Sequence, residues 1–314
     1  MRLELALTSA AVAAATPLAA QSAPVQLFSF SGATPIENSA LRSESQLLLT
    51  TTGSNELYQL NPLAESPEAK PVAVFPGITA LTGIAEIAPG KFAVQGGVPG
   101  NGTYQYYNAT VYTVDFGAGG DAVPTVEAVA EVPDSILLNG LVALPLLPHI
   151  VLSTDSVAGC IWRIDTVTGA VDKAITDAAL EVPANATTPL GANGLKIHGG
   201  HVYFTNTGAG LFARALITPT GDRIGDVEVI ATVPAGTNWD DLAIDAAGVA
   251  YLSQSPGAVV RITSDGTSTF VVGADDDTSL SGRPTSITLP KGGKKAYVTT
   301  GGGTAAGKVF EISL

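Results

Sequence analysis

Six short segments of the sequence begin with a polar residue that leads directly into an apolar run. Carboxylate and amide oxygens are the ligands that Ca²⁺ or Mg²⁺ prefers, and Zn²⁺ or Mn²⁺ also accepts them. If the six first residues converge, they would form a ring able to hold a cation or a small polar molecule. The alternative is that each one serves only the turn chemistry at the start of a strand. These six head residues are Glu37, Thr82, Asn139, Asn193, Asp240 and Thr285.

Residues suited to covalent hydrolysis lie elsewhere. The three histidines, His149, His198 and His201, fall in turns or at the starts of outer strands, away from the heads. The sequence contains no Gly-x-Ser-x-Gly elbow, and Cys160 begins an outer strand, as a small buried hydrophobe would. A nucleophilic serine or cysteine mechanism is therefore disfavoured.

The elements that must position the heads form a repeat. The heads are 45, 57, 54, 47 and 45 residues apart, and each is followed by apolar runs of four to eight residues separated by turn residues. Four strands per unit and six units predict an all-β fold, a six-bladed β-propeller. The last unit has only three strands, so we expect the N-terminal segment Val25–Phe30 to close the ring. A two-sheet sandwich would not explain six regularly spaced heads.

Composition limits the possible partners. The 314 residues are 46% hydrophobic and 14% charged, which excludes a disordered chain. The formal net charge of −13 disfavours nucleic acid and anionic membranes as partners, because such surfaces are bound by basic patches. A single cysteine excludes an intramolecular disulfide and a cysteine-rich metal site.

The N-terminus predicts export. Arg2 precedes an apolar, alanine-rich run that ends in small residues, so residues 1–20 are expected to be a signal peptide and residues 21–314 one propeller domain. The run is too short to span a membrane and contains Pro17. Three Asn-x-Thr sequons favour a secreted glycoprotein, with glycosylation expected at Asn101, Asn108 and Asn185.

The heads resemble those of the SMP-30/gluconolactonase/strictosidine-synthase-like propellers. The resemblance implies that Glu37, Asn193 and Asp240 hold a divalent cation and that Asn139 lies beside the substrate. Two departures from the lactonase pattern lie next to proposed ligands. Glu37 is followed by Asn38-Ser39 rather than Gly-Pro, and Asp240 by Asp241 rather than Gly.

A second resemblance is to exported fungal propellers that include the hetero-Diels–Alderases of tropolone–sesquiterpenoid pathways. It implies a cycloaddition between an o-quinone methide and a humulene-type alkene, a reaction that requires no cofactor. The segments that carry it are Glu37-Asn-Ser-Ala-Leu-Arg42, Leu47-Leu-Leu-Thr50, Asn193-Gly-Leu-Lys-Ile, Tyr203-Phe-Thr-Asn206, Asp240-Asp-Leu-Ala-Ile-Asp245 and Arg283-Pro-Thr-Ser286.

A cycloaddition needs two partners held in contact, a donor to the heterodiene oxygen and exclusion of water. Arg42, Asn139 and Trp239 are the candidate catalytic residues, while Thr82, Asn139, Trp239 and Thr285 are expected to bind substrate. Trp239 could equally pack between blades, and Arg42 could pair with Glu44 at the surface. A divalent-metal lactonase and a non-catalytic ligand-binding propeller stay open as alternatives, as do the substrate and the oligomeric state.

Overall fold

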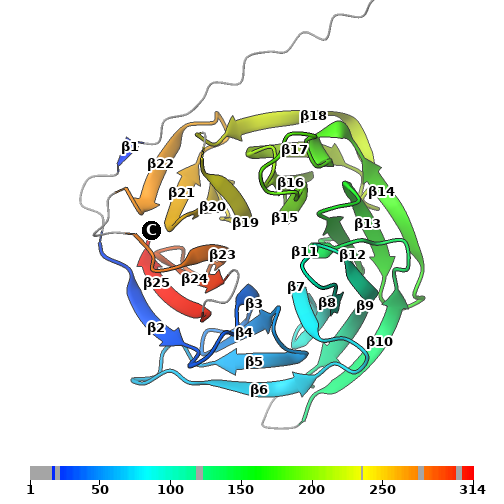
Figure 1. Cartoon of the computed structure of the whole chain (residues 1–314), viewed down its shortest axis with the longest axis horizontal. Coiled ribbons are helices and arrows are strands. Elements are labelled where there is room, and N and C mark those ends of the chain that lie inside the picture. The colour runs from blue at the N-terminus through cyan, green and yellow to red at the C-terminus, as the bar shows by residue number, and fades with distance from the viewer. Residues whose placement is uncertain (1–15, 18–21, 118–122, 235, 275–278, 302–305) are drawn as a thin grey trace, which may run out of the picture.

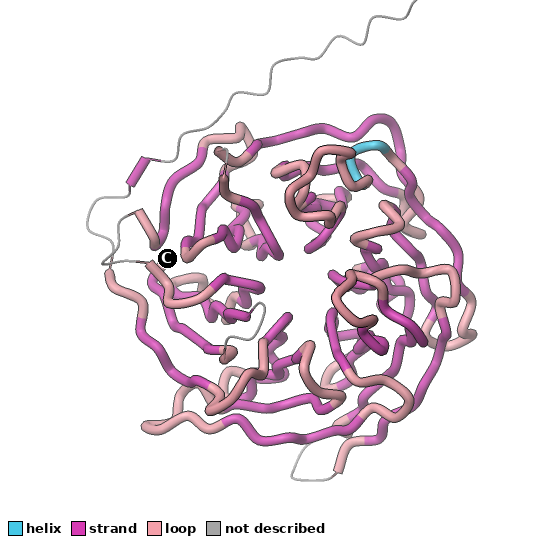
Figure 2. The backbone as a smooth tube through the Cα atoms, viewed as in Figure 1, coloured by secondary structure: helices cyan, strands magenta, loops and turns pink. Residues whose placement is uncertain are grey.

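Six β-sheets surround a central channel in the computed structural model, which describes residues 16–17, 22–117, 123–234, 236–274, 279–301 and 306–314 (Figure 1). Almost all of the regular structure is strand, with one short 3₁₀ helix, η1 (Ala178–Leu180), in the described residues (Figure 2). The prediction of a six-bladed propeller is confirmed. No helix in these ranges has the length and apolar character needed to cross a membrane.

Each blade is a four-stranded antiparallel meander whose first strand lines the channel. Blade one contains β3 (Ile36–Ser43), β4 (Gln46–Thr51), β5 (Glu56–Leu60) and β6 (Ala69–Val74). Blade two contains β7 (Ala80–Ala88), β8 (Lys91–Pro99), β9 (Tyr106–Asp115) and β10 (Thr125–Glu131). Blade three contains β11 (Leu138–Leu144), β12 (Leu147–Asp155), β13 (Cys160–Asp165) and β14 (Val171–Thr176).

The remaining blades repeat this order. Blade four contains β15 (Ala192–His198), β16 (His201–Asn206), β17 (Leu211–Ile217) and β18 (Arg223–Thr232). Blade five contains β19 (Asn238–Ile244), β20 (Ala250–Ser255), β21 (Ala258–Ile262) and β22 (Ser268–Val272). Blade six contains β23 (Arg283–Thr288), β24 (Lys295–Gly301) and β25 (Lys308–Ser313), with β2 (Val25–Ser29) as its outermost strand.

The N-terminal strand β2 closes the ring, as predicted. It pairs antiparallel with β25, from Val25 opposite Glu311 to Ser29 opposite Lys308. The last blade therefore depends on a strand from the start of the chain, which covers the edge of β25. A second N-terminal strand, β1 (Thr16–Pro17), pairs parallel with β22 and falls within the segment predicted as leader. Most of that segment lies outside the described residues, and the domain limits stay a prediction.

The hydrophobic core lies between neighbouring blades rather than at one centre. Between blades one and two, for example, Leu48, Phe75 and Phe92 are fully buried in one cluster. Each sheet buries both faces, which explains why its strands read as near-continuous apolar runs instead of a strict alternation. The inner strands contact one another in a closed ring, so the backbone around the channel is fixed from both sides. These six strands are β3, β7, β11, β15, β19 and β23.

Candidate active site at the channel mouth

Every inner strand is interrupted at its head residue by a β-bulge. The register of β3 against β4 shifts between Ile36 and Asn38, so that Glu37 is the unpaired residue. A bulge of this kind bends the strand and re-aims the side chain that it carries. The corresponding shifts in the other inner strands lie at Leu81/Ile84, Leu138/Leu141, Ala192/Leu195, Trp239/Leu242 and Pro284/Ser286.

A side chain of the preceding blade holds the backbone carbonyl of four head residues. Thr50 Oγ1 donates to the carbonyl of Thr82 at 2.6 Å, and Gln95 Nε2 donates to that of Asn139 at 2.8 Å. The hydroxyls of Thr154 and Thr205 donate in the same way to the carbonyls of Asn193 and Asp240. At the ring closure, Thr285 Oγ1 donates to the carbonyl of Ile36 at 2.8 Å. At five of the six junctions between blades, a side chain of one blade thereby helps to position the bulge of the next.

Glycine follows three of the heads because neighbouring inner strands approach too closely for a side chain. A Cβ atom at Gly140 would lie 2.6 Å from the carbonyl oxygen of Asn193, and one at Gly83 would lie 2.6 Å from that of Asn139. A Cβ at Gly194 would overlap the carboxylate of Asp241. The Asn-Gly pairs therefore mark close backbone approach at a bulge, rather than turns.

All six head side chains line one pocket of about 210 Å³ at the channel mouth. Asn139 and Asn193 are almost fully buried, whereas Glu37 and Asp240 remain partly exposed to the pocket. None of the three histidines lines this pocket. Residues from strand ends and connecting loops complete its wall: Thr52, Tyr104, Tyr106, Leu137, Leu190 and Arg283.

The two carboxyl groups bind protons more tightly than usual. Burial, followed by the charge of Asp241, raises the pKa of Glu37 to about 7, while Arg283 acts in the opposite direction. Burial and the charge of Glu37 likewise raise the pKa of Asp240, against the lowering effects of Arg283 and of a hydrogen bond with Asn193. Burial raises the pKa of Tyr106 as well, with a smaller contribution from Glu37. Near pH 7 the pocket therefore offers both an acid and a cation.

Asn193 supplies the remaining polar group at the floor. Its Nδ2 donates to Thr207 Oγ1 at 2.9 Å, and that hydroxyl donates to the carbonyl of Trp239 at 2.9 Å. Its Oδ1 is buried and has no hydrogen-bond partner among the residues that the structure describes. Because an unpaired buried oxygen is costly, this atom is set to meet a donor or a cation. Together with Glu37 and Asp240 it forms an oxygen donor set that suits Ca²⁺ or Mg²⁺.

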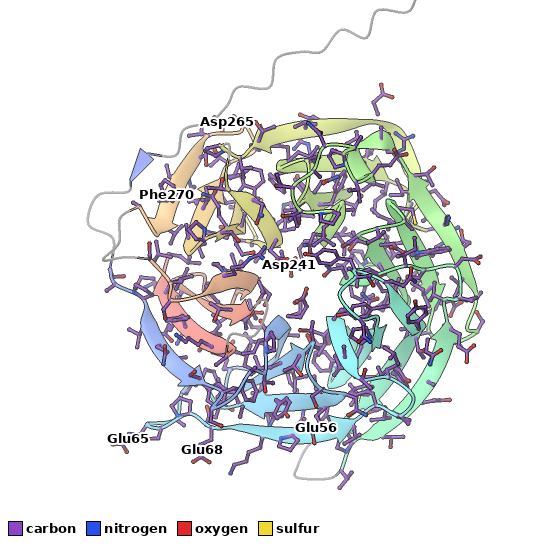
Figure 3. All side chains as sticks on the ribbon, in the orientation of Figure 1. Glu56, Glu65, Glu68, Asp241, Asp265 and Phe270 are labelled. Atoms are coloured by element: carbon purple, nitrogen blue, oxygen red, sulfur yellow. The ribbon has the colours of Figure 1, made fainter. Side chains whose placement is uncertain are left out.

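An ion pair lies in the channel wall next to this site. Lys196 Nζ lies 2.9 and 3.0 Å from the two carboxylate oxygens of Asp241, whose side chain is only 3% exposed. Figure 3 shows Asp241 at the centre of the ring, whereas Glu56, Glu65 and Glu68 lie at its outer edge. Lys196 also lines a separate cavity between the inner strands. The acidic residue that follows Asp240 is thus paired within the protein.

Two residues expected at the mouth lie elsewhere. Arg42 is five residues beyond Glu37 along an extended strand, which carries it roughly 16 Å away. Its guanidinium stacks 4.2 Å from the centre of the Phe116 ring and contacts Gln59, not Glu44. Trp239 precedes Asp240 and therefore points to the opposite side of the strand. It is 2% exposed, packs against Phe212 and donates to Gln254 at 3.0 Å.

Sequence reasoning missed the six wall residues other than the heads, and three of these carry a charge or an aromatic ring: Tyr104, Tyr106 and Arg283. Arg283 begins β23, is exposed, and donates through Nε to Ser255 Oγ at 3.2 Å. Tyr104 and Tyr106 come from the connection between β8 and β9 and from the start of β9. Arg283 precedes the sixth head by two residues, so strand alternation could have placed it on the same side as Thr285. No spacing rule could have placed the tyrosines, because Tyr104 lies in the connection between β8 and β9 and Tyr106 is the first residue after it.

The sequence is similar to two fungal proteins. It is 28% identical over 272 residues to a protein of Phoma sp named "Putative hetero-Diels-Alderase". The aligned region covers 79% of this chain and 77% of that protein. It is also 28% identical over 233 residues to "Putative hetero-Diels-Alderase asR5" of Sarocladium schorii, covering 67% of this chain and 58% of that protein. The chain thus spans less than two thirds of the second relative.

The fold is that of gluconolactonase-like propellers. A solved gluconolactonase from Xanthomonas campestris superposes with a TM-score of 0.63 at 14% identity, covering 97% of this chain and 98% of that one. No protein-family model matches the sequence. At that identity, the likeness describes the architecture alone.

Proposed function

We propose that the channel-mouth pocket binds a small organic substrate and catalyses a hetero-Diels–Alder cycloaddition between an o-quinone methide and a sesquiterpene alkene. The names of the two fungal relatives support this activity, and the pocket offers the groups that it requires. The reaction consumes no cofactor, because both new σ bonds form from π electrons of the two partners. No water, proton or electron is exchanged overall.

In this proposal the heterodiene oxygen accepts a hydrogen bond from protonated Glu37 or from Arg283. Such a donor stabilises the negative charge that develops on this oxygen in the transition state. Asn139, Thr82 and Thr285 orient the polar end of the substrate, and the rings of Tyr104 and Tyr106 flank its planar face. The pocket of about 210 Å³ takes the heterodiene, while the bulkier alkene extends over the rim.

One observation carries this proposal: Glu37, with a pKa of about 7, shares a pocket with Arg283 and aromatic walls. The test generates a quinone methide in situ, adds humulene and measures the rate of adduct formation with and without protein. We expect an acceleration that EDTA leaves unchanged and that Glu37→Ala, whose side chain cannot donate, reduces roughly 100-fold, the usual effect of losing one such donor. Glu44→Ala, an exposed change outside the pocket, is the matched control. An adduct rate equal to the background would contradict the proposal.

We propose a divalent-metal lactonase as the second candidate, favoured by the unpaired Oδ1 of Asn193 in a pocket that also contains the carboxyl groups of Glu37 and Asp240. Glu37, Asn193 and Asp240 would hold Ca²⁺, Mg²⁺, Zn²⁺ or Mn²⁺, with Asn139 orienting the substrate. A bound cation would supply polarisation of the lactone carbonyl. Turnover of gluconolactone that is lost with EDTA and in Asp240→Ala would establish this reading instead. If the protein catalyses the cycloaddition instead, Asp240→Ala removes only a carboxyl group near Glu37. The adduct formation should then stay measurable and insensitive to EDTA.

We also propose that the protein passes through the secretory pathway. Support comes from the apolar leader and from the three sequon asparagines, Asn101, Asn108 and Asn185, which are all exposed. Expression in a fungal host followed by mass spectrometry of the medium would test both the cleavage and the glycosylation. Unmodified protein retained in the cells would count against it.

A further inference from the structure

A second cavity shares one lining residue, Tyr106, with the mouth pocket. It has a volume of about 300 Å³ and is formed by the first part of β9 and by the connection between β10 and β11. We call it the rim pocket. The residues that line it are Gln105, Tyr106, Tyr107, Asn108, Ala109, Thr110, Glu131, Val132, Pro133 and Ser135.

The rim pocket is held in shape by backbone hydrogen bonds. The amide of Tyr106 donates to the carbonyl of Ile136 at 2.8 Å, and that of Val132 donates to the carbonyl of Ala109 at 2.9 Å. The amide of Ser135 donates to Val132 at 3.0 Å and closes a turn at the base. The two walls are therefore tied together on both sides of the cavity. A cavity so braced is a permanent feature of the surface and not a gap between loose loops.

The hydroxyl of Ser135 lines this cavity and has no hydrogen-bond partner in the described part of the chain. The residue is only 6% exposed. A buried hydroxyl without a partner costs free energy, and the residue lines the cavity. A ligand that brings a donor or acceptor to this depth would recover that free energy.

The other polar groups select the kind of ligand. Glu131 is the single charged side chain among the described residues that line the cavity, so an anion would find no counter-charge there. Gln105 and Asn108 add amide donors and acceptors, and Gln105 Nε2 already donates to the carbonyl of Tyr106 at 3.1 Å. Tyr107 is 58% exposed and offers an aromatic face beside them. Hydroxyl-binding side chains next to an aromatic face suit a ring with polar edges and an apolar C–H face.

We propose that the rim pocket binds a neutral polyhydroxylated ligand of the sugar class. Two sources could supply it: a free sugar, or the first sugar of a glycan attached to Asn108, whose exposed side chain belongs to the pocket and to an Asn-Ala-Thr sequon. The proposal does not depend on the reaction at the mouth pocket. Because Tyr106 forms part of both cavities, an occupant would contact a residue that also lines the mouth pocket.

Binding is tested on the full chain by titration calorimetry and saturation-transfer NMR, with N-acetylglucosamine, glucose and glucuronate as probes. The protein is prepared with Asn108 intact and as Asn108→Gln. Binding of the two neutral sugars to both forms identifies free sugar as the source, whereas binding only to Asn108→Gln identifies the attached glycan as the occupant. No binding of neutral sugars to either form overturns the proposal.

Two variants tie the signal to this cavity. Ser135→Ala should weaken binding roughly threefold to tenfold, the effect of one hydrogen bond, while the exposed control Ser45→Ala should not change it. Glucuronate should bind more weakly than glucose, and Glu131→Gln should remove that difference. These comparisons are made in whichever form binds the neutral sugars, with Asn108 intact or as Asn108→Gln. In that form, equal affinities with and without Ser135→Ala, or equal binding of glucuronate and glucose, would each overturn the proposal.

Discussion

Glu37 on blade one and Asp240 on blade five line a single pocket, where burial first, and then the charge of Glu37, raises the pKa of Asp240. Burial first, and then the charge of Asp241, raises the pKa of Glu37, and Arg283 offsets part of the effect on both residues. Two negative charges in a partly desolvated pocket destabilise each other, so each carboxyl group favours its protonated form. The pair is therefore the titrating centre of the pocket, and its protonation links the chemistry of the mouth to the stability of the ring.

Glu37→Gln should flatten the pH dependence of stability. The pKa of Glu37 is raised from 4.5 to about 7 in the folded protein. Its contribution to stability is therefore complete below pH 4.5 and is lost as the pH rises through 7. A shift of this size corresponds to at most about 3 kcal/mol of unfolding free energy. Urea unfolding at pH 5 and pH 8 measures it, with Glu44→Gln as the control. Parallel pH profiles of wild type and Glu37→Gln would contradict the assignment.

Arg283→Gln should move the titration of Glu37 to higher pH. The guanidinium lowers the pKa of Glu37, so its removal leaves burial and the neighbouring carboxylate unopposed. Arg283→Lys keeps the charge and should restore most of the wild-type midpoint. NMR titration of the ¹³C-labelled glutamate side chains follows the change directly. A midpoint that falls or stays constant in Arg283→Gln would show that the cation does not act on Glu37.

Gly140→Ala should destabilise the ring at the junction of blades three and four. The added Cβ would lie 2.6 Å from the carbonyl oxygen of Asn193 and 2.8 Å from Leu195, so the backbone must move. Overpacking of this kind costs roughly 1–3 kcal/mol. Gly32→Ala is the matched control, because nothing lies within 4 Å of its added atom, and its effect should stay within about 0.5 kcal/mol. Chemical denaturation compares the two, and equal stabilities would refute the close approach.

Deleting residues 22–31 should open the ring. The deletion removes β2, uncovers the edge of β25, and takes away Phe28 and Phe30, which pack against the cluster around Leu47 and Tyr297. We expect a thermal midpoint lower by roughly 5 °C or more, with aggregation through the exposed strand. Val25→Thr changes one exposed side chain of the same strand and should be nearly neutral. An unchanged midpoint of the deleted protein would mean that β2 is dispensable.

The sequence predicted the fold and the head positions because both depend on a repeat. Apolar runs and turn residues recur with the same order in every blade, so β17 could be predicted residue for residue as Leu211–Ile217. The sequence did not reveal the bulges, because one extra residue in a strand does not change its amino-acid composition noticeably. That is why Asn139 and Asn193, each followed by glycine, looked compatible with turns.

Trp239 and Arg42 do not line the mouth pocket, for two different reasons. Trp239 points to the other side of its strand, and Arg42 lies too far along its strand. Trp239 and Asp240 are neighbours in sequence, yet one packs into the core between blades while the other faces the pocket. Arg42 lies in the same strand as Glu37, but the extended strand carries it away from the mouth. Tyr104 and Tyr106 lie in and directly after a connection that does not recur in the other blades, so the repeat pattern does not predict their place in the site.

The hydrogen bonds between blades bind the head residues through their backbone carbonyls. The side chains of Thr50, Gln95, Thr154 and Thr205 each donate a hydrogen bond to a main-chain carbonyl, which every amino acid possesses. These hydrogen bonds therefore do not depend on which side chain the head residue carries. We expect that substitutions at these four heads change the chemical character of the pocket while the blades keep their arrangement.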